Sequence, residues 1–151
     1  MDPSAHVILL VEDSPEDTEV VLRAFRKSGL VNPIRHCADG DEALDYLHRR
    51  GRYAEPDAAP RPSVILLDLN MPGTDGREVL SEIKQTEELR QIPVVVLTTS
   101  SDERDIEKCY AMGANSYIKK PVDLDGFMRA VQLLKDYWLQ IVILPKANDT
   151  K

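Results

Sequence analysis

The sequence predicts a doubly wound α/β fold: a five-stranded parallel sheet flanked by five helices, with an apolar C-terminal extension. First, short aliphatic segments alternate five times with segments of helical spacing, an order typical of a sheet covered by helices. Second, residues 64–67 and 94–97 are apolar at every position, as in strands buried on both faces of a parallel sheet. Third, the chain has 151 residues, the size of one ordinary domain.

The strands are expected where β-branched and aliphatic residues cluster, at residues 7–11, 34–37, 64–67, 94–97 and 116–118. Between them, apolar residues three and four positions apart predict helices. These helices are marked in order by Val21, Ala24, Phe25 and Ser28; by Ala43, Leu44 and Leu47; by Val79, Leu80 and Ile83; by Ile106, Cys109, Tyr110 and Met112; and by Leu124, Phe127, Met128, Val131 and Leu134. Gly29 and Gly113 are expected to end the first and fourth helices, since glycine favours the conformation that closes a helix.

Two segments lie outside this alternation. Residues 49–62 are rich in Arg, Pro, Ala and Gly and lack an apolar period, so we expect a long exposed loop. Residues 1–136 are then expected to form the domain, and residues 137–151 a C-terminal arm that ends in a frayed tail at 146–151. The apolar residues of this arm are Trp138, Leu139, Ile141, Val142, Ile143 and Leu144.

The composition argues against several kinds of partner. Lys and Arg total 19 and Asp and Glu total 26, a net charge of -7, which disfavours nucleic acid bound through a general basic surface. The apolar runs at 7–11 and 138–144 are too short for a signal peptide or for a bilayer span of about 20 residues. Cys37 and Cys109 match no metal spacing and are too few for a disulfide scaffold. We therefore expect a cytoplasmic protein with neither a nucleic-acid nor a membrane partner.

Chemically active residues follow the expected strands, where ligands bind in a parallel α/β sheet. They are Glu12, Asp13, Asp68, Thr98, Thr99, Lys119, Lys120 and Pro121. Clustered carboxylates repel one another, and a hard divalent cation such as Mg²⁺ removes the repulsion. A carboxylate beside such a cation and an ammonium group can accept a phosphoryl group as an acyl phosphate. Taken alone, an acidic pair such as Glu12 and Asp13 is more often a solvated loop or a helix start, here with Ser14 as the cap. Its joint occurrence with the other strand-end residues favours a site.

These segments resemble the receiver domain of a two-component response regulator. The resemblance lies in residues 8–13, 66–76, 93–99 and 113–121 and covers roughly residues 6–136. It implies a flavodoxin-like receiver fold and a phosphoacceptor signalling protein rather than an enzyme, with self-catalysed phosphotransfer and autodephosphorylation as its only reactions. About fifteen residues follow the fifth helix, too few for a helix-turn-helix module. We therefore expect a relay or switch that acts by contact with another protein.

The resemblance implies a chemical role for each matching residue. Asp68 matches the phosphoacceptor, and Thr98 and Lys120 match the catalytic residues that contact the phosphoryl oxygens. The implied ligands of Mg²⁺, or of Mn²⁺ in its place, are Glu12, Asp13, Asp68 and the main-chain carbonyl of Asn70.

Further roles concern the signal itself. Thr98 and Tyr117 match the switch pair, in which the hydroxyl moves toward the phosphoryl group and the aromatic ring changes rotamer. Asn70 and Ser100 match the variable positions linked to the dephosphorylation rate. The resemblance also implies a cis bond before Pro121. Lys119, by strand alternation, is expected to be a solvated charge.

A narrower resemblance joins the segments 49–62, 12–17 and 138–145 to stand-alone regulators paired with bacterial phytochrome histidine kinases. It implies a sensor histidine kinase of the phytochrome type as partner, with a phosphotransfer protein downstream. The arm either folds back on its own domain or packs on a second copy. The β-branched residues 141–143 favour an extended arm, and the regulators it resembles dimerise through the fourth helix, fifth strand, fifth helix and C-terminal segment. A homodimer is therefore expected.

Two other functions compete with this interpretation. A haloacid-dehalogenase-like phosphatase also forms an aspartyl phosphate, but that family has a second Asp as general acid where this chain has Asn70, which cannot exchange a proton in that role. A receiver that is never phosphorylated and acts as a scaffold is disfavoured, because Asp13, Asp68, Thr98 and Lys120 are all present.

Overall fold

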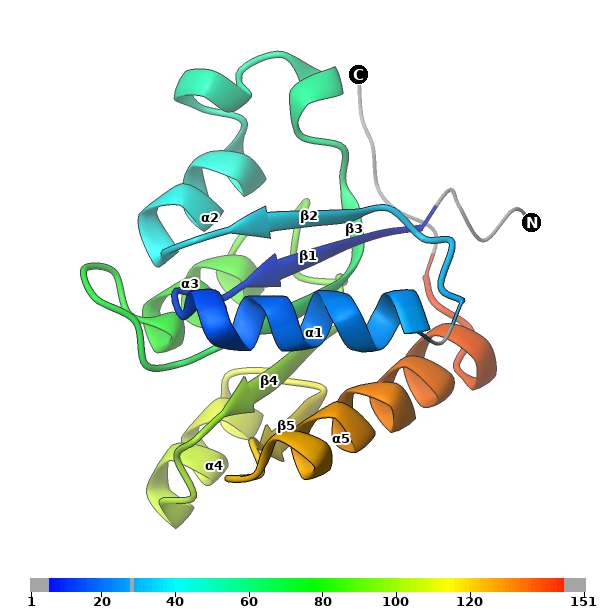
Figure 1. Ribbon diagram of the computed structural model, residues 1–151. Coiled ribbons are helices and arrows are strands. Elements are labelled where there is room, and N and C mark those ends of the chain that lie inside the picture. The colour runs from blue at the N-terminus through cyan, green and yellow to red at the C-terminus, as the bar shows by residue number, and fades with distance from the viewer. Residues whose placement is uncertain (1–5, 28, 146–151) are drawn as a thin grey trace.

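The computed structural model describes residues 6–27 and 29–145, apart from the side chains of Pro56, Gln140 and Ile141. Five parallel strands form one sheet in the order β2-β1-β3-β4-β5 (Figure 1). They are β1 (Val7–Val11), β2 (Ile34–Cys37), β3 (Pro62–Leu67), β4 (Val94–Thr98) and β5 (Ser116–Lys119). All five expected strands are confirmed, and the last three are slightly longer than predicted. Ser28 and the tail at 146–151, which the sequence analysis singled out, lie outside the described residues.

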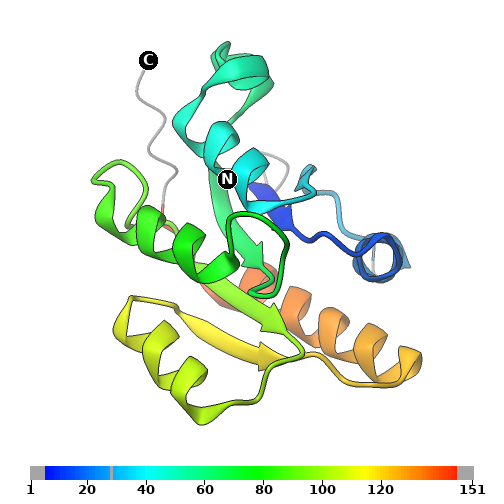
Figure 2. The same ribbon diagram turned by 90° about the vertical axis from the view of Figure 1, so that its left-hand side faces the viewer.

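Five helices cover the two faces of the sheet, as Figures 1 and 2 show. They are α1 (Pro15–Lys27), α2 (Gly40–His48), α3 (Gly76–Gln85), α4 (Glu103–Ala111) and α5 (Leu124–Asp136). Alternate residues of a strand point to opposite faces. Leu9 and Val11 of β1 therefore pack with α2, α3 and α4, while Ile8 and Leu10 pack with α1 and α5. The doubly wound fold is confirmed.

The strand order places β1 and β3 side by side at the centre of the sheet. The chain leaves β1 toward β2 at one edge and then crosses to β3 on the other side. The final residues of the two central strands, Val11 and Leu67, are paired in register. Ligands of open α/β sheets bind at such a reversal of strand order, so the residues that follow Val11 and Leu67 occupy the favoured position for a site.

Helix boundaries follow local side-chain chemistry. The side chains of Asp39, Asp75, Asp102 and Asp123 accept main-chain N–H bonds at the starts of α2, α3, α4 and α5. At α1, the Ser14 hydroxyl oxygen accepts from the N–H of Asp17, as a capping serine does. Gly29 and Gly113, just beyond the ends of α1 and α4, have φ values of 75° and 109°. Both helix ends expected at these glycines are confirmed.

The segment at residues 49–62 is more ordered than expected. It contains two short 3-10 turns, η2 (Gly51–Tyr53) and η3 (Pro56–Ala58), and its last residue begins β3. The Tyr46 hydroxyl donates to the carbonyl of Pro60 at 2.7 Å, and Arg49 Nε donates to that of Ala59 at 3.2 Å. Ala59 itself is fully buried. Most of residues 50–57 are exposed, as a loop would be. The two turns, these hydrogen bonds and buried Ala59 nevertheless give the segment more order than its lack of an apolar period suggests.

The C-terminal arm also departs from expectation. Instead of extending, the chain continues α5 with a π-helical turn, η4 (Tyr137–Ile141). Trp138 follows Leu134 by four residues and therefore lies on the same helix face, where it is only 8% exposed and joins the core beneath α1 and α5. Leu139, Val142 and Leu144 pack against that core, while Ile143 is 95% exposed. The expected extended arm is wrong, and the division at residue 136 stays a prediction.

Candidate functional site

Three carboxylates meet where the two central strands end. Glu12 and Asp13 follow β1, Asp68 follows β3, and the N–H of Asp68 donates to the carbonyl of Val11 at 3.0 Å. Glu12 and Asp68 are buried, and Asp13 is partly exposed. One carboxylate oxygen from each lies within 4.8 Å of the others. This cluster, predicted from the strand ends, offers only oxygen ligands, the kind that Mg²⁺ and Mn²⁺ accept, so the residues fit a divalent cation.

Burial and mutual repulsion both oppose ionisation of the clustered carboxylates. Burial, together with the charge of Asp68, raises the pKa of Glu12 to about 7, although a hydrogen bond from Lys120 opposes the shift. A divalent cation would favour ionisation of all three carboxylates. The main chain of Glu12 is also fixed: Nε2 of His36, on β2, lies 2.8 Å from its carbonyl oxygen and must donate, because a carbonyl only accepts. His36 was not among the residues expected at the site from the sequence.

The Lys120 ammonium contacts three carboxylates, two from the acidic cluster and one from α1. Its Nζ lies 2.6 Å from Glu12 Oε1, 2.8 Å from Asp17 Oδ2 and 3.4 Å from Asp68 Oδ2. Its side chain is 4% exposed. Burial alone would lower the pKa of Lys120, but the hydrogen bonds to Asp17 and Glu12 and the charge of Asp68 outweigh burial and raise it to about 12. The predicted ammonium beside the Asp68 carboxylate is therefore present and protonated.

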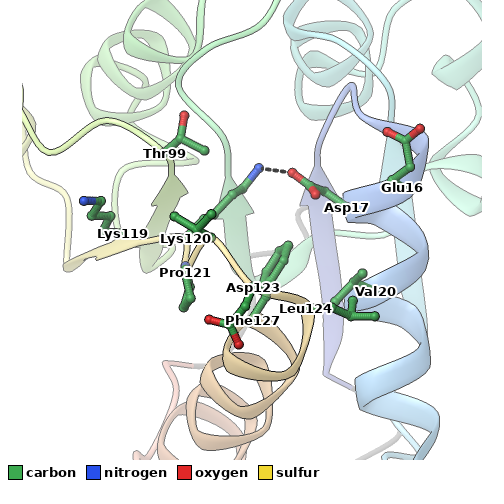
Figure 3. Close-up of a pocket in the computed structure, with 11 residues that line it drawn as sticks. Glu16, Asp17, Val20, Thr99, Lys119, Lys120, Pro121, Asp123, Leu124 and Phe127 are labelled. Carbon is green, nitrogen blue, oxygen red and sulfur yellow. Dashed lines mark hydrogen bonds and ion pairs between the residues drawn. The ribbon is translucent and has the colours of Figure 1, made fainter.

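Asp17 is a site residue that the sequence analysis missed. It lies in the first turn of α1, and Figure 3 shows its carboxylate pointing at the Lys120 ammonium, whereas the neighbouring Glu16 points away. Asp17, Lys120, Pro121 and Phe127 belong to the lining of a cavity of about 410 Å³ between α1 and the start of α5. The available signal was its place in the chain: Asp17 stands in the first turn of the helix that begins directly after the residues following β1.

Thr98 and Asn70 complete the inner part of the site. Thr98 is fully buried at the end of β4. The Asn70 side-chain amide donates to Thr98 Oγ1 at 3.2 Å, and the Asn70 N–H donates to Asp68 Oδ1 at 3.3 Å. These bonds link the ends of β3 and β4 across the predicted phosphoacceptor. The main-chain carbonyl of Asn70 as a metal ligand stays a prediction.

The two predicted switch residues meet at Ser100. Its N–H donates to Thr98 Oγ1 at 3.4 Å, and its carbonyl accepts from the Tyr117 hydroxyl at 3.0 Å. The Tyr117 ring is half-buried and packs against the core beneath α2, α3 and α4. Ser100 Oγ donates to Asp105 Oδ2 at 2.9 Å, so the Ser100 side chain is hydrogen-bonded to the first turn of α4.

Two smaller expectations have opposite outcomes. Lys119 is exposed, as strand alternation predicts. The bond before Pro121 is not cis, since the described residues contain no cis peptide bond. The trans form is the more stable form of such bonds, and with it Lys120 Nζ still reaches Asp68. The arm residues lie at the far end of α5 from this site (Figure 1) and contribute nothing to it.

Comparison with known proteins adds independent findings. The family described as response regulator receiver domain matches residues 8–132. Response regulator Rcp1 of Synechocystis is 44% identical over 141 residues, which cover 93% of this chain and 94% of Rcp1. The probable methanogenesis regulatory protein FilR2 of Methanothrix harundinacea is also 44% identical, over 88% of this chain and 83% of FilR2.

Solved structures similar to this chain are also response regulators. The Mn²⁺-bound form of Rcp1 has a TM-score of 0.88 and 43% identity, over 93% of this chain and 99% of that one. The phosphorylated cyanobacterial phytochrome response regulator RcpA has a TM-score of 0.88 and 42% identity, with the same coverage. Among the described residues, no helix is both long and apolar enough to cross a membrane. The fold, the acidic cluster and the family match agree: this chain belongs to the response regulator receiver family.

Proposed function

We propose that this receiver accepts a phosphoryl group on Asp68 from a sensor histidine kinase and signals through phosphorylation-dependent protein contacts. The observation that carries the proposal is the position of Asp68, at the end of β3, with Lys120 Nζ at 3.4 Å and two further carboxylates beside it. In the reaction, one Asp68 oxygen bonds to phosphorus while the bond from phosphorus to the donor histidine nitrogen breaks, and its electron pair leaves with that nitrogen.

The surrounding residues have separate tasks in this proposal. Lys120 donates to a phosphoryl oxygen, and the Thr98 hydroxyl bonds another. Glu12, Asp13 and Asp68, with the Asn70 carbonyl, would hold Mg²⁺ or Mn²⁺, which when bound would neutralise charge on the transferring oxygens. The chain acts as phosphoacceptor rather than as an enzyme, and hydrolysis of its own phosphoryl group ends the signal.

The signal is proposed to travel from Thr98 to Tyr117. Movement of Thr98 toward the phosphoryl group alters its contact with the N–H of Ser100, whose carbonyl holds the Tyr117 hydroxyl. The ring, already half-buried, is then buried further. Asn70 contacts both Asp68 and Thr98, which suits a residue that tunes dephosphorylation; Ser100 is proposed to tune it from the start of α4.

The proposed kinase is of the phytochrome type, with a phosphotransfer protein downstream, and the proposed compartment is the cytoplasm. RcpA is described as a phytochrome response regulator, which supports the first part. FilR2, equally identical in sequence, is described by a different process, so the kinase needs a test of its own. The two buried free cysteines suit a reducing compartment.

We further propose a homodimer through the face formed by α4, β5 and α5. Tyr110, Leu133 and Tyr137 are each about half exposed there and border a cavity of about 450 Å³ that Trp138 also lines. An exposed apolar surface of this kind is typical of a protein interface.

Phosphotransfer from a kinase tests the partner. A purified bacterial phytochrome histidine kinase, labelled with radioactive phosphate on its histidine, should pass the label to this chain and not to an Asp68→Asn variant. Absence of transfer, with the kinase active toward its own regulator, would contradict the phytochrome partner. Multiple turnover of a generic aryl phosphate would instead support the phosphatase alternative.

A further inference from the structure

The Lys120 ammonium has no unused hydrogen-bond donor. An ammonium group carries three protons, and three carboxylates lie within reach: Glu12 at 2.6 Å, Asp17 at 2.8 Å and Asp68 at 3.4 Å. The longest of the three distances is the one to the proposed phosphoacceptor. The resting structure therefore holds the ammonium closer to Glu12 and Asp17 than to Asp68.

We propose that Asp17 is a positioning residue that draws the Lys120 ammonium away from Asp68 and competes with the phosphoryl group for it. The inference rests on the proposed function, because it needs Asp68 to be the phosphoacceptor. It assigns to α1 a direct influence on how readily the site is phosphorylated and how long the phosphoryl group remains.

The competition follows from counting acceptors. A phosphoryl group brings three acceptor oxygens and a charge of about -1.5 to -2. A hydrogen bond from Lys120 to one of these oxygens must replace a bond that the ammonium already makes. The Asp68 carboxylate becomes part of the acyl phosphate, and Glu12 belongs to the cluster that fits a cation. Asp17 neither reacts nor belongs to the cation cluster, so it remains the persistent competitor for the ammonium.

The position of Asp17 suits this role. Its N–H is held by the Ser14 hydroxyl at 3.2 Å in the first turn of α1, which fixes the main chain. Its side chain is 30% exposed, whereas those of Glu12 and Lys120 are 2% and 4% exposed. Both residues line the cavity between α1 and the start of α5, and Figure 3 shows the Asp17 carboxylate facing the Lys120 ammonium. The Asp17 carboxylate therefore has access to water and can release Lys120 without being left buried and unpaired.

Removal of this carboxylate should free Lys120 for the phosphoryl group. Asp17→Asn should be phosphorylated faster by acetyl phosphate with Mg²⁺, and should lose the phosphoryl group more slowly once the donor is removed. A partly exposed ion pair has a modest energy, so the expected changes are about two- to five-fold. Asp17→Glu keeps the charge and should restore rates close to those of the wild type.

Glu16→Gln is the matched control. It removes one negative charge from the same helical turn, but Glu16 is exposed and points away from Lys120. Its rates should equal those of the wild type. If Glu16→Gln and Asp17→Asn accelerate labelling equally, general charge removal explains the effect, and the proposed role of Asp17 is wrong. A slower Asp17→Asn, or one unchanged in both rates, would also overturn it.

A second measurement needs neither metal nor phosphodonor. The buried, hydrogen-bonded ammonium of Lys120 should give its own ¹H–¹⁵N signal, which Asp17→Asn should shift or broaden and Glu16→Gln should not. An unaltered signal in Asp17→Asn would contradict the contact in solution. If the wild type takes up no phosphoryl group at all, the proposed function fails and this inference fails with it. If the wild type is phosphorylated but Asp17→Asn has the same rates of phosphorylation and dephosphorylation, only this inference is overturned.

Discussion

Arg77, in the first turn of α3, forms a two-pronged ion pair with Asp105, in the first turn of α4. Arg77 Nη2 lies 2.6 Å and Nε 2.9 Å from the two carboxylate oxygens of Asp105. Asp105 also accepts from the hydroxyl of Ser100, whose carbonyl holds Tyr117. The ion pair thus ties α3 to α4 and to the proposed switch, and its geometry is the strong, forked kind.

The first prediction concerns this ion pair and pH. The hydrogen bond from Arg77 lowers the pKa of Asp105 to about 2 from 3.8. A carboxyl group with a lowered folded-state pKa stabilises the fold above about pH 4, and this contribution is lost as the pH falls toward 2. Asp105→Asn should therefore cost about 1 kcal/mol of unfolding free energy at pH 7 and progressively less below pH 4.

Urea unfolding at several pH values measures this difference. Glu107→Gln, an exposed charge on the same helix, should unfold like the wild type throughout. A deficit of Asp105→Asn that stays constant between pH 7 and pH 3 would show that the ion pair does not have this role.

The second prediction concerns the metal cluster. Asp13 is its most exposed carboxylate, so replacing it should remove a ligand without disturbing the core. Asp13→Asn should bind Mg²⁺ at least about tenfold more weakly in calorimetric titration. Glu16→Gln should bind normally, and an equal loss in both variants would point to general charge attraction instead of ligation.

The third prediction concerns the contact between Tyr117 and Ser100. Tyr117→Phe removes the hydroxyl that holds the Ser100 carbonyl at 3.0 Å, so main-chain amides near Ser100 should exchange hydrogen faster, with a stability loss of about 1 kcal/mol. Tyr137→Phe, at an exposed tyrosine, serves as the comparison. Unchanged exchange near Ser100 in Tyr117→Phe would argue against this link in the proposed switch.

The fourth prediction concerns the arm. Trp138 is 8% exposed within the core beneath α1 and α5, so Trp138→Ala should lower the unfolding free energy by about 3 kcal/mol. Tyr137→Ala, at a half-exposed neighbour, should cost less than about 1 kcal/mol. Equal effects would mean that the arm does not fold back in solution.

Light scattering of the same samples tests the proposed homodimer. A wild type that is monomeric at tens of micromolar would contradict it.

The central sheet and the position of the site could be predicted because each proposed site residue stands at or just after the end of a strand that the sequence marks by its apolar residues. Asp68 stands directly after a fully apolar run, and Lys120 after another short strand, so parallel strands alone bring them to one edge. No knowledge of helix packing is needed for that result.

The residues that were not predicted make side-chain contacts between different secondary-structure elements. Asp17 reaches Lys120 across 103 residues of chain, and Arg77 reaches Asp105 only once α3 and α4 have packed side by side. Such contacts depend on helix rotation and side-chain length, which a periodic pattern does not specify. Trp138 was misjudged for a related reason: local β-branching favoured an extended arm, while burial on the face of α5 favoured the helical turn that the chain adopts.

The most direct test of the account is phosphorylation of Asp68 itself. The chain is incubated with acetyl phosphate and Mg²⁺, and its intact mass is measured with and without EDTA. We expect one added phosphoryl group in the wild type, none in Asp68→Asn, and none in EDTA, because Asp68 is the acceptor and the acidic cluster needs its cation. Undiminished labelling of Asp68→Asn, or an unlabelled wild type, would contradict it.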